Sequence, residues 1–65
     1  MIFKVKEPIV VTIYESEEES VDETLGPNEE IEVDLLSNDN GILNIQFGDG
    51  SITWINNQDI TIINE

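Results

Sequence analysis

The chain has 65 residues and a formal net charge of −13, because 15 acidic residues are balanced by only two basic ones. Cysteine and histidine are absent, which excludes disulfide bonds and the usual zinc ligands. With only Lys4 and Lys6 to contact phosphates, direct binding to DNA or RNA is not expected. The sequence shows neither a secretory signal pattern nor the ~20 apolar residues of a membrane span, so we expect a single cytoplasmic domain over residues 1–65.

The N-terminal region consists of short runs of β-branched residues, a composition typical of strands. Residues 2–5 and residues 9–13 both alternate in hydrophobicity. Pro8 separates the two runs. Because proline is confined to the edges and interruptions of sheets, this region is predicted as one edge strand or two short strands. Tyr14 falls out of phase with the apolar residues of the second run, so we expect it on the surface.

Residues 15–34 hold ten carboxylates and no basic residue. So many like charges repel one another and lower the stability of a small domain. A segment of this composition does not bury enough apolar surface to order itself, and residues 15–30 are therefore predicted to form a long acidic loop. Gly26, Pro27 and Asn28 are predicted to end this loop with a turn.

The chain from residue 30 onward has the pattern of antiparallel strands. Ile31, Val33 and Leu35 are predicted on a buried face, and the acidic residues between them on the solvent face. Two hairpin turns are predicted. One lies at residues 38–41, where an Asn-Gly pair tolerates positive φ angles, and the other at residues 48–50.

Three further segments complete the predicted strands, two after the first turn and one at the C-terminal end. Residues 56–59 are predicted as a connector with one 3₁₀ turn, and a last short strand follows at residues 60–63. The side chains predicted to be buried on the two strands that flank the second turn are Leu43, Ile45, Phe47, Ile52 and Trp54. Partial exposure of Trp54 is the alternative, because a core this small does not readily enclose an indole.

This order of elements resembles that of SH3-like barrels: strand, long loop, strand, hairpin, strand, hairpin, strand, 3₁₀ turn, strand. The resemblance covers nearly the whole chain. It implies an all-β fold, a single small five-stranded barrel in which the acidic segment is the long first loop. The aromatic and proline positions of proline-recognising SH3 domains are not evident, so the resemblance does not imply binding of proline-rich peptides. An OB-like barrel or another small β-roll is the alternative fold.

The chain carries no pattern of catalytic residues, so we expect a protein that is not an enzyme and has neither a cofactor nor a dedicated metal site. Its serines have no histidine beside them to act as a base. A pair of carboxylates in so small a domain lacks the cleft that would raise the pKa of one of them. Residues 38–41 look like the start of a calcium loop, but Phe47 stands where the EF-hand pattern requires glutamate. A weak carboxylate site for a divalent cation is the remaining alternative.

The acidic residues have two interpretations. They keep a small β protein soluble, or they replace nucleic-acid phosphates on a basic partner. In size, charge and lack of catalytic residues the chain resembles the acidic DNA-mimic inhibitors encoded by bacteriophages, which block nucleases, DNA glycosylases, CRISPR effectors or transcription proteins. That resemblance implies a basic nucleic-acid-binding protein as the partner. The residues predicted to contact it are Tyr14, Glu15, Glu17, Glu18, Glu19, Asp22, Glu23, Glu30, Glu32 and Asp34.

An apolar contact surface is the main alternative. Val10, Leu36, Ile55 and Ile63 fall on the nominally outer faces of their strands, where they form an apolar strip or are covered by the twist of a closed barrel. Such a strip is typical of a homodimer interface or a docking surface. The protein is then a small structural or adaptor module, such as a phage virion or regulatory component.

Overall fold

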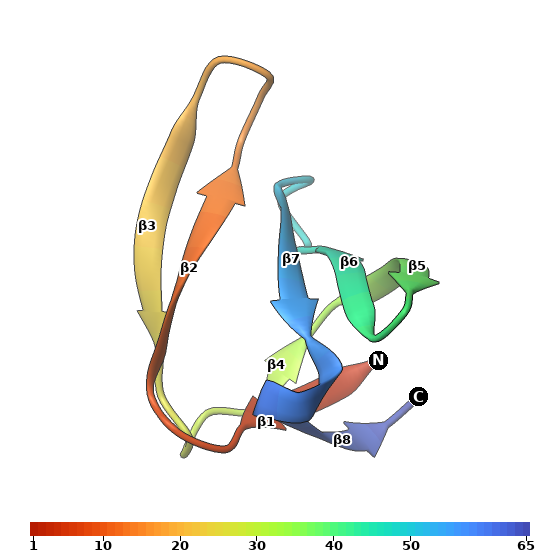
Figure 1. Cartoon of the computed structure of the whole chain (residues 1–65). Coiled ribbons are helices and arrows are strands. Elements are labelled where there is room, and N and C mark those ends of the chain that lie inside the picture. The colour runs from red at the N-terminus through yellow and green to blue at the C-terminus, as the bar shows by residue number, and fades with distance from the viewer.

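The computed structural model describes all 65 residues and contains eight strands, one 3₁₀ turn and no α-helix (Figure 1). Every pair of neighbouring strands is antiparallel. The elements in chain order are β1 (Ile2–Val5), β2 (Ile9–Tyr14), β3 (Ser20–Leu25), β4 (Ile31–Glu32), β5 (Asp34–Asp39), β6 (Ile42–Gln46), β7 (Ile52–Asn56), the 3₁₀ turn η1 (Asn57–Asp59) and β8 (Ile60–Asn64).

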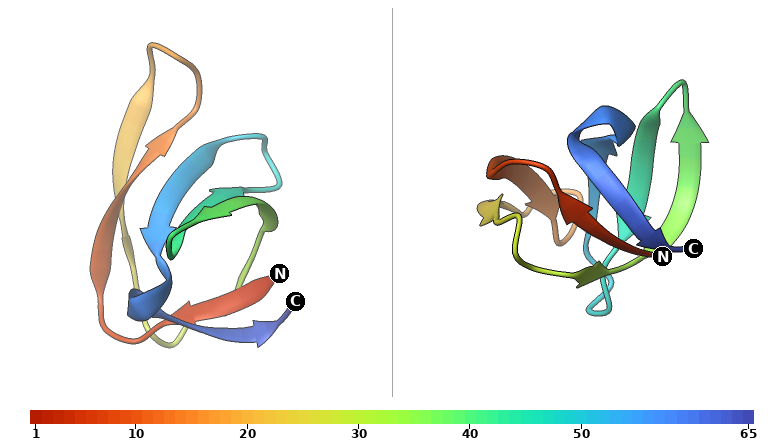
Figure 2. Two further views of the ribbon diagram at one scale, coloured as in Figure 1. Left: turned by 45° about the vertical axis from the view of Figure 1, so that its right-hand side comes forward. Right: turned by 90° about the horizontal axis from the view of Figure 1, so that it is seen from below.

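The strands form two sheets (Figure 2). One has three strands in the order β4–β1–β8, and the other has five in the order β3–β2–β7–β6–β5. The prediction of an all-β fold is confirmed, whereas the prediction of a closed five-stranded barrel is wrong. The edge strands β3 and β5 of the larger sheet do not pair with each other, so this sheet does not close on itself.

Ten buried apolar side chains form one core, to which both sheets contribute. Phe3 and Ile45 are completely inaccessible to solvent, and they come from different sheets. Because burying one large apolar side chain stabilises a fold by roughly 1.5–3 kcal/mol, this cluster is the main source of stability in so small a domain. Its members are Phe3, Val5, Val11, Ile13, Leu25, Val33, Leu43, Ile45, Ile55 and Ile60.

The N-terminal region is two strands rather than one. β1 ends at Val5, β2 begins at Ile9, and Pro8 lies in the connection between them. The two strands belong to different sheets, so the chain passes from one sheet to the other at the proline. Proline suits this position because it has no backbone N–H to donate to a sheet. The second of the two sequence interpretations is therefore confirmed.

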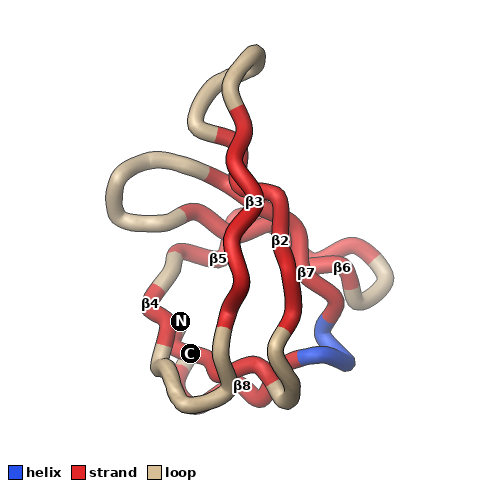
Figure 3. Tube along the Cα trace, turned by 90° about the vertical axis from the view of Figure 1, so that its left-hand side faces the viewer, coloured by secondary structure: helices blue, strands red, loops and turns tan.

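The acidic segment contains a strand, and the prediction of an unbroken loop over residues 15–30 is wrong. β3 pairs with β2 along all six of its residues. Figure 3, seen from the side of this hairpin, shows the two strands running beside each other. The sequence did not predict this strand because its residues do not alternate between apolar and polar. Val21 and Glu23 are exposed, and only Leu25 is buried. Backbone pairing with β2, rather than apolar burial along its length, places β3.

Both predicted hairpin turns are confirmed. Asn40 and Gly41 connect β5 to β6 with φ angles of 53° and 89°, the pair of left-handed conformations that a type I′ turn requires. The backbone N–H of Gly41 donates to Oδ1 of Asn38 over 3.1 Å. The turn between β6 and β7 contains Gly50 at a φ of 93°. The predicted 3₁₀ turn follows β7, and the side chain of Asn56 caps it.

The two faces of β7 are opposite to the prediction. Thr53 and Ile55 are buried, Ile52 is half-buried, and 48% of the surface of Trp54 is exposed. This strand has apolar residues on both faces, so alternation alone does not decide which face is inside. Thr53 is buried without losing a hydrogen bond, because its hydroxyl donates to the backbone oxygen of Thr12 over 2.7 Å. Trp54 is thereby left on the outer face.

The alternation predicted for residues 30–35 holds for the first five of them. Val33 is buried, Ile31 is half-buried, and the acidic residues that flank them are exposed. Leu35 departs from the prediction, with 48% of its surface exposed. It lies on the edge strand β5, whose pairing with β6 shifts register between Leu35 and Ser37.

Candidate protein-interaction surface

The β2–β3 hairpin extends away from the three-stranded sheet, with its tip at the far end of the molecule (Figure 1). Hydrogen bonds close the tip into a tight turn. The backbone N–H of Glu15 donates to the backbone oxygen of Glu19 over 2.9 Å. The hydroxyl oxygen of Ser16 accepts from the backbone N–H groups of Glu18 and Glu19, at 3.3 and 3.1 Å. The tip therefore has a defined backbone shape despite its charge.

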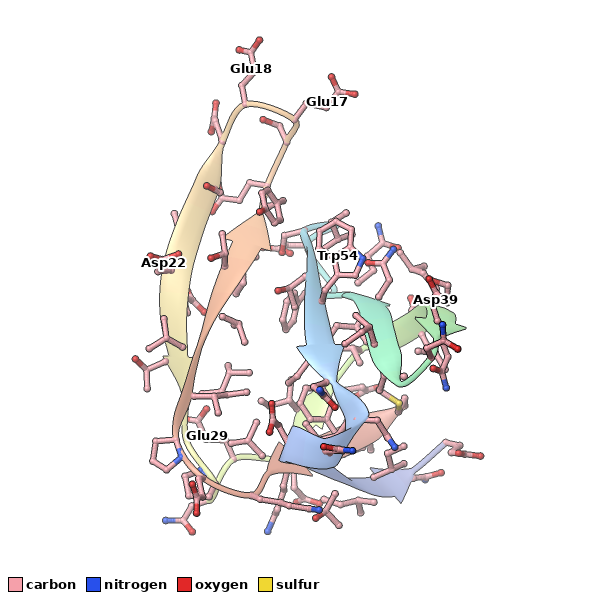
Figure 4. All side chains as sticks on the ribbon, viewed as in Figure 1. Glu17, Glu18, Asp22, Glu29, Asp39 and Trp54 are labelled. Atoms are coloured by element: carbon pink, nitrogen blue, oxygen red, sulfur yellow. The ribbon has the colours of Figure 1, made fainter.

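Carboxylates cover the hairpin at its tip and on both faces. Four glutamates lie in residues 15–19. Asp22 lies opposite Thr12, whose hydroxyl donates to Oδ1 of Asp22 over 2.8 Å. Glu23, one residue later, faces the other side, where it lines a cavity of about 170 Å³ together with Asp49. Figure 4 shows carboxylates at the tip and along the flank of the hairpin.

The hairpin brings together most of the residues predicted to contact a partner. Glu30, Glu32 and Asp34 are exposed, as expected, but they belong to β4, the residue before it and the start of β5. β4 lies in the three-stranded sheet, so these three acids form a separate group rather than a continuation of the hairpin. The predicted contact residues that share the hairpin are Tyr14, Glu15, Glu17, Glu18, Glu19, Asp22 and Glu23.

Neither basic residue lies on the hairpin. Lys4 is on β1. Lys6 is the first residue after β1, and it lines a shallow cavity together with Asp59. β1 is at the end of the molecule opposite the hairpin tip (Figure 1). Exposed charges further apart than the Debye length of about 8–10 Å are largely screened at physiological salt. The carboxylates of the tip are therefore not neutralised from within the chain.

Two exposed aromatic rings form a contact below the hairpin tip. Tyr14, at the end of β2, and Trp54, on β7, have ring centroids 5.5 Å apart and ring planes at 78°. Tyr14 is exposed, as predicted from its phase, at 40% of its surface. Trp54 was predicted on the buried face of its strand, with partial exposure as the alternative, and the alternative is what is found. The neighbouring Thr53 is buried in its place, and burial is compatible with its hydroxyl because that group donates to a backbone oxygen.

The predicted apolar strip is formed only in part. Ile55 is buried in the core, which contradicts the expectation that it lies on the surface. The other three residues are exposed, but Val10 lies on β2 and the remaining two lie on β5 and β8. A depression of about 210 Å³, lined by both apolar and polar side chains, is found instead beside Leu35 and Ile62. The alternative contact surface is therefore at the β5 and β8 side of the molecule.

One carboxylate of the β6–β7 turn has a shifted pKa. Asp49 accepts hydrogen bonds from the side-chain hydroxyl and from the backbone N–H of Ser51, and these bonds lower the pKa of the Asp49 carboxyl from its ordinary value of 3.8. A group whose pKa is lower in the folded state stabilises the fold above the unfolded-state pKa. That contribution is lost as the pH falls through the folded-state pKa.

We predict that Asp49→Asn lowers the thermal midpoint more than Asp39→Asn does at pH 7. Each variant removes one negative charge, from the β6–β7 turn or from the end of β5 beside the β5–β6 turn, and only Asp49 accepts charge-assisted hydrogen bonds from Ser51 that the substitution weakens. The difference between the two variants is expected to shrink as the pH is lowered from 7 into the acidic range and through the lowered pKa of the Asp49 carboxyl. Thermal unfolding followed by circular dichroism at pH 7 and along an acidic series checks this. A difference that persists at low pH would contradict it.

The structure has no group of three or more acidic side chains positioned to hold a metal ion. None of its elements is a helix long and apolar enough to cross a membrane. Comparison of the chain with known protein families, with curated proteins and with solved structures finds no match. Functional interpretation therefore depends on the surface chemistry of the hairpin and its surroundings.

Proposed function

We propose that this chain is a non-catalytic protein that binds the basic nucleic-acid-binding surface of a partner protein and so excludes DNA or RNA from it. The observation that carries this proposal is the projecting β2–β3 hairpin, which holds carboxylates on its tip and both faces and no basic residue. The nucleic-acid site of a nuclease, DNA glycosylase, CRISPR effector or transcription protein has the complementary charge. Docking onto such a surface relieves the self-repulsion of the acids and accelerates association.

The spacing of the exposed acids around β4 supports the mimicry of phosphates. Side chains on one face of a strand recur every ~6.7 Å, because successive residues advance by about 3.3 Å and alternate between faces. Phosphates of one DNA strand advance by about 3.4 Å along the axis, so the carboxylates of a strand match the spacing of every second phosphate. Glu30, Glu32 and Asp34 alternate with Ile31 and Val33 at this spacing, whereas β3 carries one carboxylate on each face, Asp22 and Glu23.

The order of the elements supports an SH3-like interpretation of the fold. The chain order matches that of SH3-like barrels: β1, then the β5–β6 and β6–β7 hairpins, then the η1 turn and β8. On this interpretation the β2–β3 hairpin takes the place of the long first loop. The acidic surface is then a modification of the loop that varies most easily, while the remaining strands provide the scaffold.

Two variants of equal net charge test the proposal. The hairpin variant replaces Glu17, Glu18, Glu19 and Glu23 with glutamine. The control variant replaces Glu7, Asp39, Asp59 and Glu65, which lie outside the hairpin, with the corresponding amides. Each variant has a net charge of −9, four units above the −13 of the wild type. Asp22 and Asp49 are left unchanged because their side chains accept hydrogen bonds within the fold.

The three proteins are immobilised, exposed to bacterial lysate and eluted with a salt gradient. We expect a nucleic-acid-binding protein to be retained by the wild type and the control variant, to be released at moderate salt, and to be displaced by duplex DNA. The hairpin variant is expected to lose at least ~100-fold in affinity, since several phosphate-like contacts are removed together. Equal retention by both variants, or no displacement by DNA, would contradict the proposal.

The depression at the β5 and β8 side, with exposed apolar side chains in and beside it, favours a second candidate, a structural or adaptor module. Leu35 and Ile62 line that depression, and Leu36 and Ile63 are exposed on the same two strands. A homodimer or a protein partner is the expected occupant on this interpretation. In the lysate experiment it predicts a partner that resists salt, is insensitive to the hairpin variant, and is lost when Ile62 is replaced by aspartate.

A further inference from the structure

A cavity lies where the hairpin tip faces the start of β7. It has a volume of about 370 Å³. Tyr14 and Trp54 form an aromatic wall on one side, and Ile52 adds an aliphatic side chain to it. Glu15 and Glu17 line it from the hairpin side. In Figure 4, Trp54 lies below the tip, on the side toward which Glu17 extends. The cavity is therefore apolar and aromatic on one side and anionic on the other, and its volume lies within the usual range for ligand sites.

This combination selects a cation that also has an apolar or delocalised surface. The faces of tryptophan and tyrosine rings carry negative electrostatic potential and attract cations within about 6 Å. The two rings here are nearly perpendicular, so they offer surfaces in two directions. The neighbouring glutamates supply a full negative charge, and no lysine lines the cavity to compete for it. An anionic or purely aliphatic ligand would leave these carboxylates without a partner.

We propose that this cavity, called here the Tyr14–Trp54 pocket, binds the guanidinium group of an arginine side chain on the partner. The proposal rests on the proposed function and names the anchor within its interface. A guanidinium is planar and weakly hydrated, so it stacks on an aromatic ring while its N–H groups bind carboxylates in pairs. A lysine ammonium is a compact and strongly hydrated charge that gains less from the rings. Arginine is also a frequent anchor in protein interfaces.

Peptides of equal charge and different cation provide the test. Fluorescein-labelled hexa-arginine and hexa-lysine are titrated with the protein at about 50 mM NaCl, and binding is followed by fluorescence anisotropy. We expect hexa-arginine to bind about 5–10-fold more tightly than hexa-lysine, from the cation–π and stacking contribution. Trp54 is the only tryptophan of the chain. Its emission is therefore expected to change saturably with unlabelled hexa-arginine at the same midpoint.

Variants of the aromatic wall separate the pocket from general charge attraction. Trp54→Leu is expected to lower the affinity for hexa-arginine about 5–10-fold and to leave that for hexa-lysine within twofold. Trp54→Phe and Tyr14→Phe retain an aromatic face and are expected to keep most of the preference for arginine. Val10→Ser, on β2 but outside the pocket, serves as the control and is expected to have no effect. Thermal unfolding confirms that each variant is folded.

The possible failures of the two proposals are distinguishable. If the two peptides bind equally and Trp54→Leu changes neither affinity, the pocket proposal is wrong. If the hairpin variant with four glutamines still loses binding in that case, the acidic surface remains supported. Conversely, a preference for arginine that disappears in Trp54→Leu would uphold the pocket. If the lysate partner is also insensitive to replacement of Glu18, Glu19 and Glu23, the hairpin glutamates outside the pocket, the mimicry of nucleic acid is overturned.

Discussion

Replacement of Phe3 with alanine is expected to leave the protein largely unfolded at room temperature. Phe3 is fully buried, on the central strand β1 of the three-stranded sheet. Truncating a buried phenylalanine costs about 3–5 kcal/mol, from the lost transfer free energy and the cavity left behind. A domain below about 70–80 residues rarely has more than about 3–5 kcal/mol of stability. The expected loss therefore matches or exceeds the whole stability of the fold.

Urea denaturation and the dispersion of amide proton signals measure this outcome. Val10→Ala is the matched control, because Val10 lies on a strand with 68% of its surface exposed. That variant is expected to lose less than about 1 kcal/mol and to remain cooperative. A folded Phe3→Ala protein whose free energy of unfolding lies within about 1 kcal/mol of that of the wild type would mean that Phe3 is not buried in the core. That result would argue against the two-sheet arrangement.

The turns of the fold were predictable because their chemistry is local. Asn40 and Gly41 have positive φ angles that few other residue pairs adopt, so their sequence fixes the β5–β6 connection without reference to the core. β6, between the two turns, has one apolar and one polar face, and its buried residues Leu43 and Ile45 follow the alternation. In these segments, local preference and burial point to the same structure.

The strand β3 and the buried face of β7 were not predicted, because both depend on a neighbouring strand. β3 has the composition of a solvated loop and becomes a strand by pairing with β2. On β7, Ile52, Trp54 and Ile55 are apolar on opposite faces, and the hydrogen bond from Thr53 to β2 accompanies the burial of one of those faces. The same reversal exposes Trp54, which the alternation assigned to the core, so only the small size of the core indicated that the indole is partly exposed. The exposure of Tyr14 was predictable from its phase alone.

The charge of the hairpin is expected to make the fold more stable as salt is added. Two unit charges about 7 Å apart repel by about 0.6 kcal/mol in water, and the hairpin tip holds four glutamates within five residues. Few apolar contacts oppose this repulsion, since Leu25 is the only buried residue of β3. Raising the salt to about 1 M shortens the Debye length to about 3 Å and removes most of the repulsion. The unfolded chain also repels itself, so the expected net gain is about 2 kcal/mol.

In a domain of this size a gain of about 2 kcal/mol raises the thermal midpoint by roughly 10 °C. Thermal unfolding between about 10 mM and 1 M NaCl measures it, and KCl is expected to act equally because screening does not depend on which small monovalent cation is used. The hairpin variant with four glutamines is expected to be more stable than the wild type at low salt and to respond less to salt. A midpoint that ignores NaCl but rises with millimolar Ca²⁺ would instead indicate a specific cation site. It would also remove the argument that the acids of the hairpin are unsatisfied until a basic partner binds.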